Sequence, residues 1–200
     1  MREQLSWKVG GQQGEGIEST GEIFAAALNR LGYFLYGYRH FSSRIKGGHT
    51  NNKIRVSTTP VHSISDDLTI LVAFDQETID VNIHELSKDG IILADAKFKP
   101  VLPSDYEVRL IVIPFTEIAK ELGTTLMKNM VAVGATSAII GLQADAYKNV
   151  VEDLFLRKGE SVVEKNMEAI QAGAKYVREE AEDVLQGYQL AAADGKNVCS

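Results

Sequence analysis

Short apolar runs alternate with amphipathic helical patterns along most of this chain, and this alternation limits the fold more than any other feature. Residues 68–74 (LTILVAF) are nearly all apolar, which is typical of a strand buried on both faces. In residues 16–31 apolar side chains recur every three to four positions, which indicates a helix packed on one side. Strands that alternate with helices through short connections favour a mostly parallel sheet. We therefore predict an α/β fold, namely a three-layer, Rossmann-like domain with helices on both faces and a C-terminal helical segment.

The same patterns predict the individual elements. Gly32 follows the helix at 16–31, where a left-handed cap is expected, and Asp75 is a good N-cap. Residues 52–57 alternate between apolar and basic side chains, which predicts a half-exposed strand. The tail 191–200 loses its periodicity and is predicted to be a linker. In chain order we expect strands at 6–10, 33–38, 52–57, 68–74, 91–94 and 108–113, the last two buried, and helices at 16–31, from 75 to 88–90, from 114 onward, and at 129–142, 147–156 and 161–186.

Charge and cysteine content exclude several classes of protein. The 200 residues include 21 Lys and Arg against 27 Asp and Glu, and the resulting net charge of −6 disfavours nucleic-acid binding. Cys199 is the only cysteine, so an internal disulfide and a thiolate metal cluster are both excluded, and we predict no metal site. The N-terminal residues lack the apolar stretch of a secretory signal, and no window of about 18 apolar residues exists. We expect a cytoplasmic protein without membrane association.

The first predicted strand leads into a glycine-rich segment, residues 10–16 (GGQQGEG), and then into a helix. Many α/β folds bind phosphate groups at such a junction. The spacing departs from the dinucleotide fingerprint, and Arg39 and His40 stand where an acidic ribose ligand is needed. A P-loop is disfavoured more strongly, because Ile17 and Glu18 replace the required Lys and Ser or Thr. Two interpretations stay open: a phosphate-binding loop of another kind, or a turn that only permits tight packing.

Residues 39–55 (RHFSSRIKGGHTNNKIR) form a basic segment in an otherwise acidic chain. The segment holds five Lys or Arg and two His without one acidic residue, which indicates either an anionic partner or a solvated basic loop. His40 and His49 lack an evident nucleophile or metal partner. No nucleophile elbow, HExxH motif or pair of carboxylates at helical spacing is present, so we predict no catalytic residue in this chain.

Three motifs together resemble the gamma subunit, or gamma domain, of 2-oxoacid:ferredoxin oxidoreductases. These are the glycine loop at 10–16, the GEIFA stretch at 21–25 and the segment SRIKGGHTN at 43–51. Residues 66–74, 129–141 and 166–173 also look similar, so the resemblance spans almost the whole chain. Gln13 departs from the glycine that this family usually has, which leaves the loop conformation open.

The resemblance implies a gamma-type domain at 1–190, followed by a linker at 191–200 toward the next domain of a fused 2-oxoglutarate-type alpha subunit. It implies oxidative decarboxylation of a 2-oxoacid with CoA, giving acyl-CoA, carbon dioxide and reduced ferredoxin. The alpha and beta parts would be the partners, and thiamine diphosphate and iron–sulfur clusters would sit on other domains. This domain would contribute to assembly and to the CoA site. The residues predicted to face CoA or a subunit interface are Gly10, Gly11, Gln12, Gly14, Gly16, Arg39, Arg44, Lys46, Gly47, Gly48 and Asn51.

Two other functions remain as alternatives. One is a stand-alone, Rossmann-like nucleotide-binding protein, which the glycine loop alone would allow. The other is an interaction module that uses the long C-terminal helix.

Overall fold

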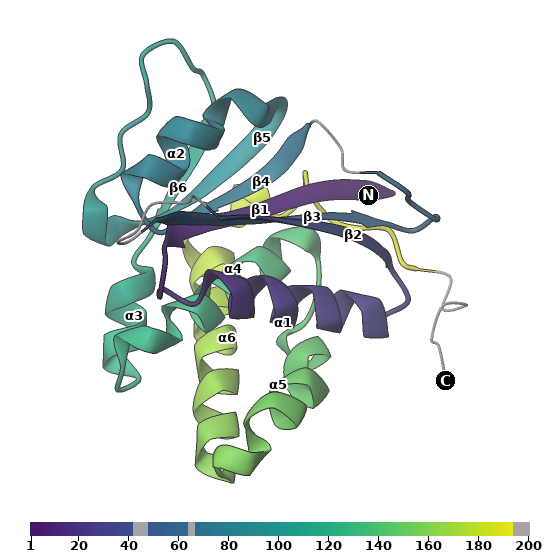
Figure 1. Ribbon diagram of the computed structural model, residues 1–200, viewed down its shortest axis with the longest axis vertical. Coiled ribbons are helices and arrows are strands. Elements are labelled where there is room, and N and C mark those ends of the chain that lie inside the picture. The colour runs from purple at the N-terminus through teal and green to yellow at the C-terminus, as the bar shows by residue number, and fades with distance from the viewer. Residues whose placement is uncertain (42–47, 64–66, 194–200) are drawn as a thin grey trace.

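The computed structural model describes residues 1–41, 48–63 and 67–193, and this part of the chain contains one six-stranded sheet (Figure 1). The spatial order is β2-β3-β1-β4-β5-β6. Strands β1, β4, β5 and β6 pair in parallel, whereas β3 is antiparallel to both β1 and β2. The predicted α/β fold with a mostly parallel sheet is confirmed. The strands are β1 (Gln4–Gln12), β2 (Phe34–Phe41), β3 (His49–Ser57), β4 (Leu68–Ala73), β5 (Leu86–Asp95) and β6 (Arg109–Ile113).

Helices cover the two faces of the sheet unequally (Figure 1). Helix α2 (Gln76–Asn82) lies on one face beside β4 and β5 and also contacts β1 and β3, whereas no helix of the described residues covers β2 there. The larger core lies on the other face, where Trp7 of β1 stacks on Phe24 with ring centroids 4.4 Å apart. The helices of that face are α1 (Ile17–Arg30), α3 (Phe115–Glu121), α4 (Lys128–Ile140), α5 (Lys148–Phe155) and α6 (Glu160–Glu180).

Helix α4 is the interior helix that its small apolar residues predict, because every residue from Asn129 to Ile140 is buried. Helix α6 packs against it with the apolar stripe that includes Ile170 and Val177. The stripe of the long C-terminal helix therefore belongs to the core, which argues against an interaction module built on it.

Three expectations about the sheet are wrong. The helix after Asp75 ends at Asn82, and a 3₁₀ turn at Ile83–Glu85 leads directly into β5, because β5 extends backward from its apolar part into polar residues. Strand β3 is not half-exposed: Lys53 is buried, because Glu85 pairs with it from beside α2. Strand β6 is mostly exposed or half-buried rather than buried, because it forms an edge of the sheet.

The segment after α6 returns to the start of the chain. The backbone amide of Arg2 donates to the carbonyl of Gln189 at 2.7 Å, and the amide of Ala191 donates to the carbonyl of Arg2 at 2.8 Å. Tyr33 also donates its hydroxyl to the carbonyl of Ala191 at 2.8 Å. Residues 187–191 thus belong to the packed domain, and the domain boundary at 190 stays a prediction. No helix of the described part is long and apolar enough to span a bilayer.

Asp75 caps α2 as predicted. Its Oδ1 accepts hydrogen bonds from the Thr78 amide at 2.8 Å and from the Thr78 hydroxyl at 2.7 Å. Because alanine offers no acceptor to this helix terminus, we expect Asp75→Ala to lower the free energy of unfolding by about 1 kcal/mol. Asp75→Asn keeps the capping oxygen and should lower the free energy of unfolding by less. Urea denaturation followed by circular dichroism measures both, and equal midpoints for Asp75→Ala and the unmodified chain would refute the cap.

Candidate functional site

The glycine-rich segment makes the passage from β1 to α1. Gly10, Gly11 and Gln12 still belong to β1, so the turn itself is short. Gly14 and Gly16 have φ values of +93° and +78°, in the left-handed region that favours glycine. Gly16 is also the N-cap of α1, and the hydroxyl of Thr20 donates to its carbonyl at 2.8 Å. The sequence pattern therefore correctly locates a strand–turn–helix junction.

A hollow of about 310 Å³ opens at this junction and is called the glycine-loop hollow below. It lies at the N-terminus of the 14-residue helix α1, where backbone N–H groups without an intrahelical partner favour anions. Glu18, in the first turn, is one of the lining residues, and its negative charge opposes an anion. The residues that line the hollow are Gln12, Gln13, Gly14, Gly16, Ile17, Glu18, Ser19 and Thr50.

Two residues far along the chain hold this junction from the side of α4, and sequence reasoning missed both. Lys128 pairs with Glu15 at 2.6 Å, and its ammonium also lies 4.9 Å from the ring centroid of Phe74. Glu15 in turn accepts from the Gln12 amide at 2.9 Å. The amide group of Asn129 donates to the Gly16 carbonyl at 3.3 Å, while its Oδ1 is buried without a hydrogen-bond partner among the described residues. Nothing in the local pattern links residues 128–129 with the loop.

The structure brings together only part of the predicted set. The carbonyl of Gly48 accepts from the Gln13 amide at 3.0 Å, so Gly48 adjoins the hollow. Arg39 pairs with Glu22 at 2.9 Å beside α1 and does not line the hollow. Asn51 lies on the opposite face of the sheet, where its Oδ1 accepts from Asn82 at 3.3 Å. Arg44, Lys46 and Gly47, together with the side chain of His40, lie outside the described residues.

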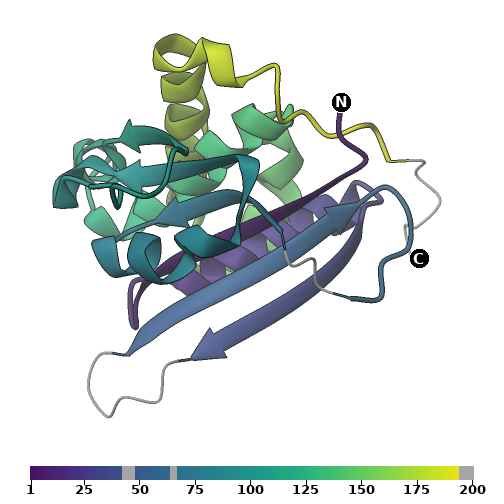
Figure 2. The same cartoon turned by 90° about the horizontal axis from the view of Figure 1, so that it is seen from above.

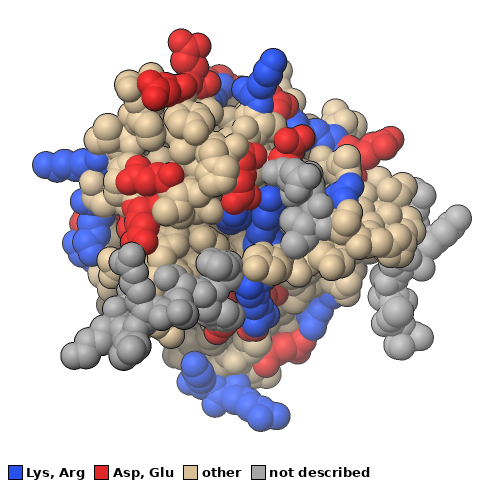
Figure 3. Space-filling view, turned by 45° about the horizontal axis from the view of Figure 1, so that its top comes forward, with Lys and Arg blue, Asp and Glu red and all other residues tan. Residues whose placement is uncertain are grey.

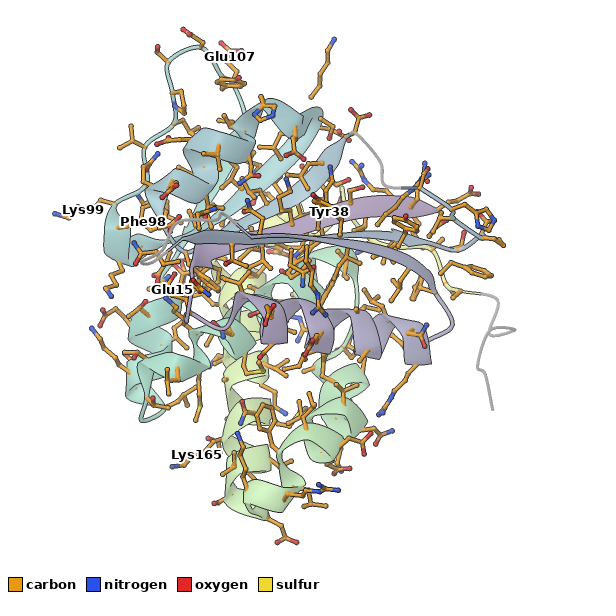
Figure 4. All side chains as sticks on the ribbon, viewed as in Figure 1. Glu15, Tyr38, Phe98, Lys99, Glu107 and Lys165 are labelled. Atoms are coloured by element: carbon orange, nitrogen blue, oxygen red, sulfur yellow. The ribbon has the colours of Figure 1, made fainter. Side chains whose placement is uncertain are left out.

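A second polar site lies across the sheet, on the face that α2 covers in part. Lys8 of β1 and Lys53 of β3 are direct partners in the antiparallel ladder, and both are almost fully buried, with 7% and 6% of their surface exposed. Glu85 bridges them: Lys8 hydrogen-bonds its Oε1, and Lys53 donates to its Oε2 at 2.8 Å. Lys8 also donates to Asn82 Oδ1 at 2.9 Å. Figure 4 shows Tyr38, which borders this site, above the sheet and Glu15 below it.

The pKa values of these groups follow from their burial and pairing. Burial lowers the pKa of Lys8, although the hydrogen bond and charge of Glu85 oppose this. Burial acts to raise the pKa of Glu85, but the hydrogen bonds from Lys53 and Lys8 outweigh it, and that pKa lies below its ordinary value. In this triad two lysine side chains share one carboxylate.

The side chain of His49 belongs to a neighbouring chain of polar contacts at the start of α2. Its Nε2 lies 2.8 Å from the Thr78 hydroxyl and 3.4 Å from Asp75 Oδ1. Burial acts to raise the pKa of Asp75, but hydrogen bonds from His49 and Thr78 outweigh it and lower that pKa. In the described residues no three His, Cys, Asp or Glu side chains are grouped to hold a metal ion.

Comparison with known proteins assigns the class to which this fold and glycine loop belong. The family model described as "Pyruvate ferredoxin/flavodoxin oxidoreductase" matches residues 6–176. The chain therefore belongs to the pyruvate ferredoxin/flavodoxin oxidoreductase family, and the predicted resemblance is confirmed.

Individual relatives agree with this family. The alpha subunit of the 2-oxoacid:ferredoxin oxidoreductase of Saccharolobus solfataricus is 35% identical over 127 residues, which cover 62% of this chain and 20% of that subunit. The 2-oxoglutarate:ferredoxin oxidoreductase from Magnetococcus marinus, solved with 2-oxoglutarate, coenzyme A and succinyl-CoA bound, superposes with a TM-score of 0.88. It is 28% identical, and the match covers 98% of this chain and 34% of that one.

A separate gamma subunit shares the fold. The keto/oxoacid ferredoxin oxidoreductase gamma subunit from Geobacter sulfurreducens PCA has a TM-score of 0.72 at 23% identity, and the match covers 88% of this chain and 99% of that subunit. By contrast, this chain spans only 20% to 34% of the first alpha subunits that it matches.

Proposed function

We propose that this chain is a non-catalytic, gamma-type domain of a 2-oxoacid:ferredoxin oxidoreductase of the 2-oxoglutarate type. The complex would convert a 2-oxoacid, CoA and oxidised ferredoxin into acyl-CoA, carbon dioxide and reduced ferredoxin. Family membership over residues 6–176 and the 98% coverage by the Magnetococcus marinus enzyme support this proposal. We further propose that this domain is fused to the next domain of an alpha subunit. The reading frame downstream of Ser200 tests this, because we expect it to continue into a thiamine-binding domain.

The glycine-loop hollow is the part of the domain that we assign to CoA. The observation that carries this assignment is the junction itself, where two left-handed glycines and the free amides of α1 surround a hollow of about 310 Å³. CoA carries phosphate groups, which helix N-termini bind through backbone N–H groups. Glu18 places a negative charge on the wall, so neutralising charge has to come from elsewhere. The basic residues Arg44 and Lys46, close in sequence to Gly48, are the candidates.

The other cofactors belong to other domains under this proposal. An iron–sulfur cluster requires several thiolates, and this chain offers Cys199 alone. Its residues therefore do not fit such a cluster, and we assign the clusters and thiamine diphosphate to the alpha and beta parts. The domain contributes to assembly with these parts, and ferredoxin reaches it only through the complex. We propose a cytoplasmic location, as for other reduced-thiol proteins.

The alternative of a dinucleotide-binding protein finds no support in the sheet. A Rossmann unit places its second strand beside the first, with an acidic residue at the end that binds the ribose. Here β3 lies between β1 and β2, and Arg39 occupies the end of β2. The glycine loop therefore lacks the acidic residue that would bind the ribose of NAD.

Replacing Arg44 and Lys46 together by alanine tests the assignment in the assembled complex. Each lost charge-assisted contact to a phosphate weakens binding, so we expect the KM for CoA to rise about tenfold or more, with a smaller change in the KM for the 2-oxoacid. Steady-state kinetics and analytical gel filtration measure turnover and assembly. The double variant Lys165→Ala and Lys175→Ala removes two exposed charges on α6 and serves as the control. Unchanged CoA kinetics and assembly in the Arg44 and Lys46 variant would refute the assignment.

A further inference from the structure

The polar site around Lys8 and Lys53, on the face that α2 covers in part, has no role in the proposed function. It is an open pocket of about 380 Å³ on the face opposite to the large core, and it is called the lysine pocket below. Its walls come from β1, β2 and β3 on the sheet and from the segment of α2 and the following turn. The lining residues are Lys8, Tyr38, His49, Asn51, Lys53, Glu77, Val81, Asn82 and Glu85.

The position of the two lysines is unfavourable without a compensating negative charge. Like charges directly opposite each other in a ladder repel, and burial adds the cost of removing both ammonium groups from water. Glu85 neutralises only one of the two charges, and both of its oxygens are already used. The buried triad therefore keeps one positive charge in excess.

The same groups hold more hydrogen-bond donors than the described residues use. Lys53 Nζ has three N–H groups and makes one hydrogen bond, to Glu85, within the described residues. Lys8 uses two of its three, toward Glu85 and Asn82. The Asn51 side chain accepts from Asn82, and its own NH₂ group has no acceptor in the described part. The pocket thus offers donors from three buried residues that the described acceptors leave partly unused.

Among the described lining residues, the rim adds the carboxylate of Glu77 to that of Glu85. Glu77 is exposed on α2, whereas Lys8 and Lys53 are buried at the base. Solvent screens an exposed carboxylate much more than a buried ammonium. On the face shown in Figure 3, basic side chains are visible near the middle, with acidic side chains beside them. For a small ligand, the excess positive charge at the base of the pocket therefore outweighs the negative charge of Glu77 at the rim.

We propose that the lysine pocket is a second ligand site, separate from the glycine-loop hollow, which binds an oxyanion between Lys8, Lys53 and the amide of Asn51. The ligand is a phosphate or a carboxylate group, since both present several acceptor oxygens and a negative charge to these donors. Such a group would neutralise the excess positive charge of the pocket, and its oxygens would accept hydrogen bonds from the unused donors.

Titration of the full chain with inorganic phosphate, and separately with succinate, tests this site by isothermal calorimetry at pH 7.5. Binding of phosphate identifies a phosphoryl ligand, binding of succinate a carboxylate ligand, and either supports the site. Lys53→Met replaces the lysine by an unbranched side chain of similar length. The variant should fold, because Lys8 and Glu85 remain as a neutral pair. We expect this variant to raise Kd about tenfold, because one charge-assisted contact is lost. Lys120→Met, an exposed lysine on α3, is the matched control and should bind as the unmodified chain does.

Two further variants distinguish an anion in the lysine pocket from an anion in the glycine-loop hollow. Glu85→Gln releases both ammonium groups, so it should lower Kd several-fold, and the anion should raise the Tm of this variant more than that of the unmodified chain. Gly14→Ala strains the glycine loop, because Gly14 has a φ of +93° although no atom lies within 4 Å of the added Cβ, and it should leave Kd unchanged. Absence of binding by both anions, or binding that survives Lys53→Met but is lost in Gly14→Ala, would overturn the proposal. The second result would place the anion in the glycine-loop hollow.

Discussion

Replacing Gly134 by alanine is expected to lower the free energy of unfolding by about 3 kcal/mol, and Gly173→Ala should do the same. The two glycines make reciprocal contacts between α4 and α6. A Cβ on Gly134 would overlap the Ile170 carbonyl and lie 2.6 Å from its carbon, and one on Gly173 would lie 2.8 Å from the carbonyl carbon of Val131. Both obstacles are backbone atoms, so no side chain can rotate away. Helix α4 is buried beneath the sheet and cannot move away from α6.

Gly187→Ala is the matched control, because no atom of the described residues lies within 4 Å of the added Cβ and the glycine has no positive φ. We expect a change within about 0.5 kcal/mol for it. Urea denaturation followed by circular dichroism compares the three variants. Equal midpoints for Gly134→Ala and Gly187→Ala would show that α4 and α6 do not approach each other as closely as described.

Glu85→Gln should cost about 3 kcal/mol of unfolding free energy at pH 7. The glutamine leaves Lys8 and Lys53 buried and opposite each other without a carboxylate. The pKa of Glu85 lies below its ordinary value of 4.5, so its contribution is complete above that pH and is lost as the pH falls through the lowered pKa. The stability difference between the unmodified chain and the variant should therefore shrink in acid.

Urea denaturation at a series of pH values between about 3 and 8 measures this difference. Glu117→Gln is the control, because Glu117 pairs at 2.8 Å with Lys120 on the exposed side of α3. Exposed pairs contribute little, so the control should have little effect at any pH. A pH-independent difference for Glu85→Gln would show that the carboxylate does not stabilise the two lysines.

The sequence predicts the parts of the fold where burial follows a simple period. The run at 68–74 and the small apolar residues at 129–142 correspond to β4 and α4, since elements buried on all sides have no polar face to interrupt the pattern. The pattern fails at β5, whose first residues are polar, and at β3, where Lys53 is buried. An isolated lysine in an apolar strand, as in SWKVGG, is the one local signal that could have indicated buried ion pairing.

The site was less predictable than the fold. Residues 10–16 mark the junction correctly, because left-handed turns require glycine. Asn51 and Thr50 are neighbours in sequence but lie on opposite faces of β3, and only Thr50 lines the glycine-loop hollow. Lys128 and Asn129 reach the loop from α4, and Glu85 reaches the lysines from the turn after α2. Such contacts depend on packing between distant elements, which no local pattern contains.

Hydrogen–deuterium exchange of the assembled oxidoreductase complex, with and without CoA, is the sharpest test of the proposed CoA site. We expect CoA to slow exchange of the amides from Gly14 to Ser19, because all of these residues except Glu15 line the glycine-loop hollow at the start of α1. Backbone amides of α5, which lie away from that hollow, serve as the internal reference (Figures 1 and 2). Protection confined to other domains, with unchanged exchange from Gly14 to Ser19, would contradict a role of this domain in binding CoA.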